Sequence, residues 1–330
     1  MSPLQNDKKA VAPTPLDLYS IRHLEALLGH TRIELEDLAK QAIRYYQPFP
    51  FKRHHAPFSR RLPSGRKRWI DNPVDPLKTI QSRIEQRLLK RVVLPEHLLG
   101  GVKGKSIADN VKKHLAAKYL VSIDIKNFFP SITPHQVYAV WRKTLNCSPD
   151  VAYLLTGLTT YRDRLPQGAP TSTLLANLVL SALDPDIRTA CDTSRITYSS
   201  WVDDLAFSGD AAPEIIGEVI ATLRKGGFSV SHHKIKIMGP SDRKLLNNLV
   251  LGRFVTVRKE YVGYIRAGIY NLKCGKVVDA EINAYVLSLE GSIGYLRLFD
   301  LKRAASLLEQ LRVAREWGTN LRTRTDFSPI

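Results

Sequence analysis

Apolar residues recur along this chain with two different spacings, and each spacing predicts a different kind of element. Over residues 21–46 and 77–93, leucine and isoleucine return every three or four positions, which is typical of amphipathic helices. The same spacing over residues 280–317 predicts a small helical bundle near the C-terminal end. Residues 171–190, rich in leucine and alanine, predict one buried helix.

Shorter apolar runs, bounded by turn residues, predict β-strands. One run ends at Asp124, a hairpin surrounds Asp203 and Asp204, and residues 228–238 form a further strand. Helices separate these runs, so the order is strand, helix, helix, strand hairpin, helix, strand. Because this order mixes antiparallel pairing with helices, it predicts an α+β fold and not a doubly wound parallel sheet.

Two of the intervening helices are marked at their first turns. Thr133 and Gln136 have the spacing of a capping box, and Pro134 lies between them at the first helical position. Ser148 followed by Pro149 has the same form. These signals predict helices that begin directly after Thr133 and Ser148.

Acidic residues stand at the ends of two strand-like runs, where apolar neighbours make a carboxylate costly to bury. These residues are Asp124 and the pair Asp203 and Asp204. Side by side, such carboxylates would repel one another, and their pKa values would rise unless a divalent cation lay between them. Two hard cations held by carboxylates stabilise the attacking and leaving oxygens of a phosphoryl displacement. The pattern therefore predicts a two-metal nucleotidyl-transfer site.

The charge of the chain indicates a partner. With 330 residues, 44% hydrophobic and 24% charged, the chain is long enough for one large domain of several lobes or two smaller ones. Its formal net charge of +18 favours a polyanion, nucleic acid first and a membrane surface second. Residues 40–118 hold 19 Lys and Arg against 5 Asp and Glu. Aromatic residues and prolines interleave over residues 45–53, which suits base stacking better than a solvated helix face.

The cysteines and the absence of long apolar runs predict where the protein is found. Cys147, Cys191 and Cys274 are far apart and include no CxxC pair, so we expect a reduced protein without a disulfide framework. The N-terminal residues have no apolar core of a signal peptide, and no apolar run approaches the roughly 20 residues that span a bilayer. These features predict a soluble cytoplasmic protein without a membrane partner.

The segment LPQGAPTS, residues 165–172, precedes the predicted buried helix. Gly168 permits close backbone approach, Gln167 offers an amide to a base or sugar, and a helix N-terminus attracts phosphate. Taken alone, the segment is equally a turn and a helix cap.

Three segments together resemble the central motifs of reverse transcriptases, in the order in which that family carries them. They are DIKNFFPSI at 124–132, LPQGAPTS at 165–172 and WVDD at 201–204. The QGAPTS form is similar to that of bacterial retron reverse transcriptases. Trp201 stands where the family usually carries tyrosine, which puts contacts with the primer end in question.

Further segments resemble retron elements, two of them with one departure each. Residues 110–114 match Asn-Ala-x-x-His with Val111 in the alanine place, and residues 249–252 resemble Val-Thr-Gly with Leu251 in the threonine place. Residues 261–276 are similar to the start of the retron thumb. The resemblance covers residues from roughly 60 to 311.

The resemblance implies a right-hand polymerase with fingers, a ferredoxin-like palm and a helical thumb. The expected divisions are an N-terminal arm and helix at 1–40, fingers at 41–118 with part of 134–164, a palm at 119–252 and a thumb at 253–330.

The resemblance also implies roles for individual residues around the metal site. Asp124 and Asp203 are expected to hold two Mg²⁺ ions, with Mn²⁺ as an alternative, while Asp204 and Ile125 complete the ligand set. Lys234 occupies the place of a lysine that protonates pyrophosphate or neutralises its charge. Lys236 is its rival for that role.

For the incoming nucleotide, Phe129 is expected to exclude a 2′-hydroxyl, and Arg68 and Arg61 to hold the triphosphate. Phe128 is alternatively a core residue. The expected nucleotide-binding set is Arg61, Arg68, Asn127, Phe128, Phe129, Gln167 and Gly168. The expected primer-end residues are Trp201 and Val202. The expected RNA-binding set is Lys103, Lys105, Asn110, His114, Gly252, Arg253 and Arg266.

Two other patterns do not indicate sites. Residues 100–106 (GGVKGKS) imitate a phosphate-binding loop, but position 99 is leucine where the first glycine belongs, and no strand precedes it. The adjacent histidine pairs at 54–55 and 232–233 lack Cys or acid at zinc-ligand spacing.

The predicted function is RNA-directed DNA synthesis of the retron type, using deoxynucleoside triphosphates. The resemblance implies a structured noncoding RNA as template and primer, priming from a 2′-hydroxyl, and RNA-linked single-stranded DNA as product. It also implies a role in anti-phage defence with an effector protein. Two alternatives remain at this point: a bacterial defence reverse transcriptase outside the retrons, and a catalytically weak RNA-binding scaffold.

Overall fold

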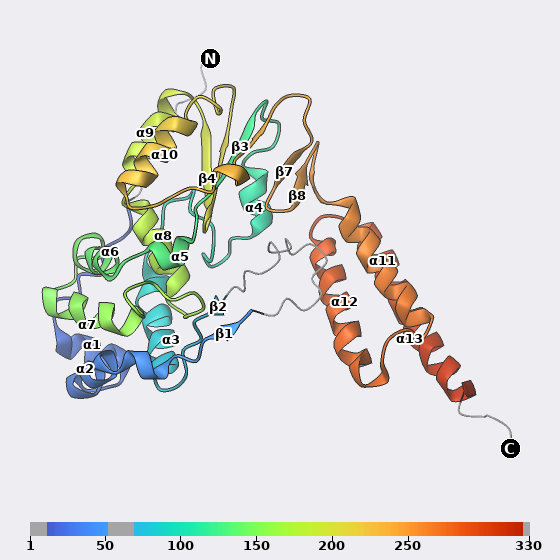
Figure 1. Ribbon diagram of the computed structural model, residues 1–330, viewed down its shortest axis with the longest axis horizontal. Coiled ribbons are helices and arrows are strands. Elements are labelled where there is room, and N and C mark those ends of the chain that lie inside the picture. The colour runs from blue at the N-terminus through green and yellow to red at the C-terminus, as the bar shows by residue number, and fades with distance from the viewer. Residues whose placement is uncertain (1–11, 52–68, 326–330) are drawn as a thin grey trace, which may run out of the picture. The chain divides into compact units, whose positions relative to one another are not determined.

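The computed structural model describes residues 12–51 and 69–325, with side chains as far as residue 316 apart from that of Asp279. Internal contacts divide the described chain into two compact units, residues 12–51 with 69–242 and residues 243–325 (Figure 1). Each unit encloses its own cluster of buried apolar side chains.

The N-terminal part of the first unit is a group of helices with a short ribbon. Helices α1, α2, α3 and α7 pack on one another around buried leucines and isoleucines. The bounds here are α1 (Ile21–Leu28), α2 (Arg32–Lys40), η1 (Ala42–Tyr45), β1 (Phe49–Pro50), β2 (Trp69–Ile70), α3 (Leu77–Arg87), η2 (Leu89–Arg91), α6 (Pro134–Ala139), the π-helix η3 (Val140–Thr144) and α7 (Pro149–Thr159). The β1 and β2 strands pair antiparallel.

The rest of the first unit is built on a four-stranded sheet of order β4-β5-β3-β6, in which every neighbouring pair is antiparallel. The strands are β3 (Leu120–Asp124), β4 (Thr197–Trp201), β5 (Asp204–Ser208) and β6 (Lys236–Met238). The helices are α4 (Ile107–Lys112), α5 (Phe128–Ser131), α8 (Ser172–Ser181), α9 (Asp184–Thr193), α10 (Ile216–Lys225) and η4 (His232–Lys234). Antiparallel pairing interleaved with helices confirms the predicted α+β class.

The two faces of this sheet have different neighbours. Tyr198 stacks on Phe207 and lies beside Asp184 of α9. Ser199 points to the opposite face, because successive residues of a strand alternate, and it contacts His114 just after α4. Helix α4 therefore covers the face opposite to α9.

The second unit consists of a three-stranded antiparallel sheet and three helices. Its elements are β7 (Lys244–Leu246), β8 (Leu249–Leu251), β9 (Val255–Val257), α11 (Lys259–Lys273), η5 (Asp279–Glu281), α12 (Ile282–Arg297) and α13 (Leu301–Thr325). The helical spacing of 280–317 thus forms α12 and α13, which pack on α11. Strands β7 and β8, which lie within the predicted palm at 119–252, belong to this unit by their contacts.

Both predicted helix starts are present. Thr133 and Gln136 form the reciprocal capping box, and the Ser148 hydroxyl accepts a hydrogen bond from the Val151 N–H. Pro134 and Pro149 each occupy the first helical turn. These helix boundaries could be predicted because capping depends only on residues within one turn.

Two predicted elements differ from the structure. The single helix expected over 171–190 is two helices, α8 and α9, because Pro185 lies in the first turn of α9 and cannot continue a helix from Ser181. The strand expected over 228–238 contains only β6 as regular strand, since residues 232–234 form the 3-10 turn η4. Within the described ranges, no helix is both long and apolar enough to cross a membrane.

Candidate active site

The three predicted acids come together at one end of the β4-β5-β3-β6 sheet. Asp124 is the last residue of β3 and pairs in register with Asp204, the first residue of β5. Directly opposed residues share one face of a sheet, with Cβ atoms roughly 5 Å apart. Asp203 lies in the turn that joins β4 to β5, and its carbonyl accepts a hydrogen bond of 2.9 Å from the Ile125 N–H. Residues some eighty positions apart therefore lie together at one end of the sheet.

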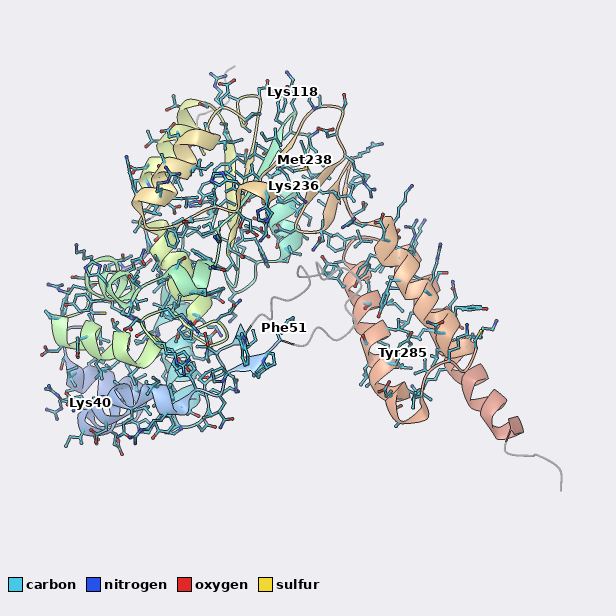
Figure 2. All side chains as sticks on the ribbon, viewed as in Figure 1. Lys40, Phe51, Lys118, Lys236, Met238 and Tyr285 are labelled. Carbon is cyan, nitrogen blue, oxygen red and sulfur yellow. The ribbon has the colours of Figure 1, made fainter. Side chains whose placement is uncertain are left out.

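A lysine neutralises part of this negative charge. The Lys234 ammonium lies 2.7 Å from Oδ1 of Asp124, whose exposed fraction is 8%. The short turn η4 brings Lys234 to this position, and the Ser231 N–H donates to the Asp124 carbonyl beside it. The rival Lys236 lies on β6, paired with Ser122 two residues before Asp124 (Figure 2). Lys234 therefore forms an ion pair with an acid of the site.

The donor set fits a hard divalent cation. Carboxylate oxygens are the ligands that Mg²⁺ prefers, and like charges directly opposed on a sheet destabilise it unless a cation compensates them. Asp124 and Asp204 form such a pair, and Asp124 already has a positive partner in Lys234. Within residues 12–51 and 69–325, no group of three or more His, Cys, Asp or Glu side chains is gathered tightly enough to hold a metal ion. Asp124, Asp203 and Asp204 are neighbours at this end of the sheet.

The turn that carries Asp203 has a strained backbone. Val202 has φ of +61°, in the left-handed region that a β-branched residue rarely enters. A two-residue hairpin turn with positive φ at its first position usually has glycine there. Such a conformation costs of order 1–3 kcal/mol and persists only where surrounding contacts enforce it. Trp201, before the turn, is half-buried at the end of β4.

The loop with Gln167 and Gly168 is fixed by an acid that the sequence did not single out. The buried Asp71 carboxylate accepts a 3.1 Å hydrogen bond from the Gln167 N–H and pairs with the Arg164 guanidinium at 3.1 Å. The Asp71 N–H in turn donates to the Gln167 carbonyl at 2.8 Å. Gly168 has φ of +128°, and a Cβ there would lie 2.6 Å from Cγ2 of Ile70. Asp71 directly follows β2, whereas Asp124 ends β3, and only the fold identifies the partners of Asp71.

The two phenylalanines after Asp124 have different surroundings. Phe128 is 2% exposed and packs on Phe228 at a centroid distance of 5.5 Å, so its side chain is part of the core. Phe129 is half-buried and packs against the margin of the core beside Phe128. Asn127, exposed with φ of +50°, precedes α5 and turns the chain there.

The predicted RNA-binding residues fall into two groups. The exposed ones are Lys103, Lys105, Gly252, Arg253 and Arg266. Arg253 lies over the ring of Phe254, an exposed aromatic residue, at 5.7 Å. Asn110 and His114 are fully buried, which contradicts the prediction that their side chains contact RNA. Arg61 and Arg68, expected at the triphosphate, lie outside the described residues.

His114 instead joins two strands of the sheet. Its Nδ1 and Nε2 atoms each lie 2.7 Å from a serine Oγ, that of Ser208 on β5 and that of Ser199 on β4. Burial away from water, with a smaller effect of the neighbouring Lys113 charge, lowers the pKa of His114 to about 4. The neutral ring, which can donate at one nitrogen and accept at the other, therefore couples β4 and β5, the two strands that the turn at Asp203 joins.

Comparison with known proteins agrees with this geometry. Residues 59–264 match the family described as reverse transcriptase (RNA-dependent DNA polymerase). The chain is 26% identical to the retron Ec86 reverse transcriptase of Escherichia coli, over 92% of this chain and 93% of that protein. It is 30% identical to the retron Ec83 reverse transcriptase of Escherichia coli, over 69% of this chain and 77% of that protein.

Other relatives are covered less fully. Identity to the retron Se72 reverse transcriptase of Salmonella heidelberg is 28%, over 58% of this chain and 48% of that protein. Among solved structures, telomerase from Candida albicans aligns with a TM-score of 0.45 and 11% identity, over 77% of this chain and 49% of that one. The family match and the retron relatives show that the chain belongs to the reverse transcriptase family and has the right-hand α+β fold of that family. It is an RNA-directed DNA polymerase of the retron type.

Proposed function

We propose that Asp124 and Asp203, with Asp204 and Ile125 in support, form the metal site at which this polymerase joins nucleotides. The observation that carries the proposal is the registered pair of Asp124 and Asp204, with Asp203 hydrogen-bonded beside them through its carbonyl. Two Mg²⁺ ions, or Mn²⁺ ions, bound there would activate the primer hydroxyl and stabilise the charge on the leaving pyrophosphate. The primer oxygen attacks the α-phosphate, and the bond from that phosphorus to the pyrophosphate oxygen breaks.

The chain's own residues bind and orient the reactants. Lys234 supplies a positive charge at the acids. We propose that its side chain moves from Asp124 to the leaving pyrophosphate, where it donates a proton or balances the negative charge. Phe129 faces the sugar and excludes a 2′-hydroxyl. The loop at Gln167 and Gly168 supports the base from the other side, held in place by Asp71. Trp201 and Val202 contact the primer end.

The retron relationship supports a specific template. We propose that a structured noncoding RNA is both template and source of the priming 2′-hydroxyl, so that the product is single-stranded DNA linked to RNA. The net charge of +18 and the exposed Lys103, Lys105, Arg253 and Arg266 support RNA binding. We further propose that the protein acts in the cytoplasm, in anti-phage defence, together with an effector protein.

Incorporation of labelled deoxynucleotides by the purified protein with its own RNA tests the proposed site. Asp203→Asn and Asp124→Asn are each expected to lower the rate at least roughly 10³-fold, because an amide cannot replace a charged metal ligand. Asp210→Asn, an exposed acid beyond the end of β5, is the matched control and is expected to keep the wild-type rate. Activity that survives both substitutions would exclude these acids as the metal site. An inactive wild-type protein that still binds its RNA would favour the scaffold alternative.

Sequencing of co-purified nucleic acid tests the lineage. DNA joined covalently to RNA, and released by a debranching treatment that opens 2′–5′ linkages, is the expected product. DNA extended only from ordinary 3′ ends would instead support a defence reverse transcriptase outside the retrons.

A further inference from the structure

The segment 97–101, hereafter the support segment, runs along the outer edge of β4 and is not part of the proposed catalytic chemistry. Ser200 donates its N–H to the His97 carbonyl at 2.7 Å, and Leu99 donates its N–H to the Ser200 carbonyl at 3.0 Å. Leu98 and Ser200 form a parallel β-bridge. The support segment thus holds the last residues of β4 directly before the strained turn at Val202.

Gly100 brings this segment into contact with the turn itself. A Cβ on Gly100 would lie 2.5 Å from both the backbone nitrogen and Cγ2 of Val202, closer than real side chains approach. Gly101 has φ of +72°, and a Cβ there would lie 2.4 Å from Cγ2 of Thr173 on α8. The two glycines, part of the sequence that imitates a phosphate-binding loop, therefore permit backbone to pack between α8 and the turn.

Asn177 fastens the support segment from the other side. This residue of α8 is fully buried, and its Nδ2 donates a 2.7 Å hydrogen bond to the Gly100 carbonyl. Helix α8 begins four residues after Gly168. The support segment consequently connects α8, the helix after the loop at Gln167 and Gly168, to the turn that carries Asp203.

We propose that Asn177 and Gly100 are positioning residues that hold the turn at Val202 in its strained form and so place Asp203 beside Asp124. A left-handed valine persists only where neighbouring contacts prevent relaxation, and the support segment provides these contacts. The proposal rests on the proposed function, since the placed acid is a proposed metal ligand. Neither residue touches a reactant, so their loss affects turnover and metal use more than nucleotide binding.

The test uses Asn177→Ala and Gly100→Ala in the full-length protein. Asn177→Ala leaves the Gly100 carbonyl buried without its donor, and Gly100→Ala pushes on the Val202 backbone. Each is expected to lower kcat roughly 10-fold or more, to raise the Mg²⁺ concentration at half-maximal rate, and to leave the KM for deoxynucleotides within about twofold. Two independent variants keep the test decisive if one of them folds poorly.

A second readout does not require activity. Trp201 adjoins the turn, so its ¹⁹F resonance in protein containing 5-fluorotryptophan, assigned with Trp201→Phe, reports the state of the turn. In both variants this line is expected to shift or broaden. The matched control is Gln81→Ala, which removes an equally buried amide bonded to a backbone carbonyl, that of Leu158 at 2.8 Å. The control is expected to lose stability while keeping kcat and the Trp201 line.

The outcomes separate the two proposals. An unchanged Trp201 line and kcat within about twofold of wild type, in both variants, would overturn the positioning role. The positioning role would also be overturned if, at equal folded fraction, the loss of kcat in both variants were no greater than the loss in Gln81→Ala. If the wild-type protein makes no DNA, the proposed function fails, and the Trp201 line alone decides whether the support segment holds the turn.

Discussion

At the scale of single residues, burial decides which polar side chains can meet a ligand. His114 and Lys103 lie close in sequence and were both predicted to bind RNA, yet Lys103 is exposed and His114 is enclosed between Ser199 and Ser208. A buried imidazole with two serine partners connects strands and has no free nitrogen for RNA. Its environment has a measurable consequence, because the pKa of His114 is about 4 and that of a free imidazole is about 6.5.

The depressed pKa predicts a specific loss of stability in acid. Above pH 6.5 the neutral His114 ring makes its full contribution to the free energy of unfolding. Below pH 6.5 the unfolded chain binds a proton at this histidine, whereas the folded chain does not bind one until about pH 4. Between pH 7.5 and pH 5 this costs about 2 kcal/mol of unfolding free energy. Denaturant unfolding at the two pH values should show this loss in the wild type and a correspondingly smaller one in His114→Asn. The exposed His135→Asn is the control; parallel pH profiles for wild type and His114→Asn would contradict the prediction.

At the scale of elements, strand β2 and the loop before α8 are held together by one buried carboxylate. Asp71 accepts from the Gln167 N–H and pairs with Arg164, while its own N–H bonds back to Gln167. The site therefore depends on an acid outside the three central motifs. An ion pair with one half-exposed partner contributes more through geometry than through Coulomb energy.

Asp71→Asn should weaken nucleotide binding more than turnover. The amide keeps the shape but removes the charge that orients Arg164, so the loop at Gln167 becomes less fixed. We expect the KM for deoxynucleotides to rise roughly 10-fold, with kcat changed less, in steady-state incorporation assays. Asp75→Asn is the control, since it removes the charge of a nearby carboxylate that accepts hydrogen bonds from Thr79 in the first turn of α3. This variant should leave the KM for deoxynucleotides unchanged. Equal KM values for the two variants would count against the role of Asp71.

At the scale of the whole molecule, the net positive charge contributes to the attraction between the protein and nucleic acid. The net charge of +18 is carried by both units, and exposed basic residues occur before α4 as well as on the second unit. Nonspecific attraction of this kind acts through the release of counterions from phosphates. Its strength therefore falls steeply as salt is added.

Lys103→Ala and Lys105→Ala should each reduce the salt dependence of RNA binding. Loss of one phosphate contact makes the slope of log K against log salt concentration less negative by about 1. Fluorescence anisotropy over a salt series measures this slope for each variant. Lys225→Ala, at the exposed end of α10, changes the net charge equally and should leave the slope unaltered. Identical slopes for all three variants would place Lys103 and Lys105 away from the RNA path.

Local signals in the sequence were sufficient for a large part of this architecture. The capping box at Thr133, the antiparallel hairpin at Asp203 and the helical spacing after residue 280 all appear in the structure. The undivided helix over 171–190 was wrong, although Pro185 marked the break, because apolar residues continue on both sides of it. Residue type alone could not separate Phe128 from Phe129, since both satisfy the same motif and only packing against Phe228 buries one.

By itself, the sequence determined the family, the net charge, the α+β class and the acids of the candidate site, because each depends on residue type or on neighbours within a few positions. Tertiary structure alone decided which residues support those acids. Asp71 meets Arg164 across 93 positions, His114 meets Ser208 across 94, and Asn177 meets Gly100 across 77. Such contacts form only when the whole core closes and excludes water, so no local pattern encodes the partner. The same closure buries His114, whose side chain is 0% exposed.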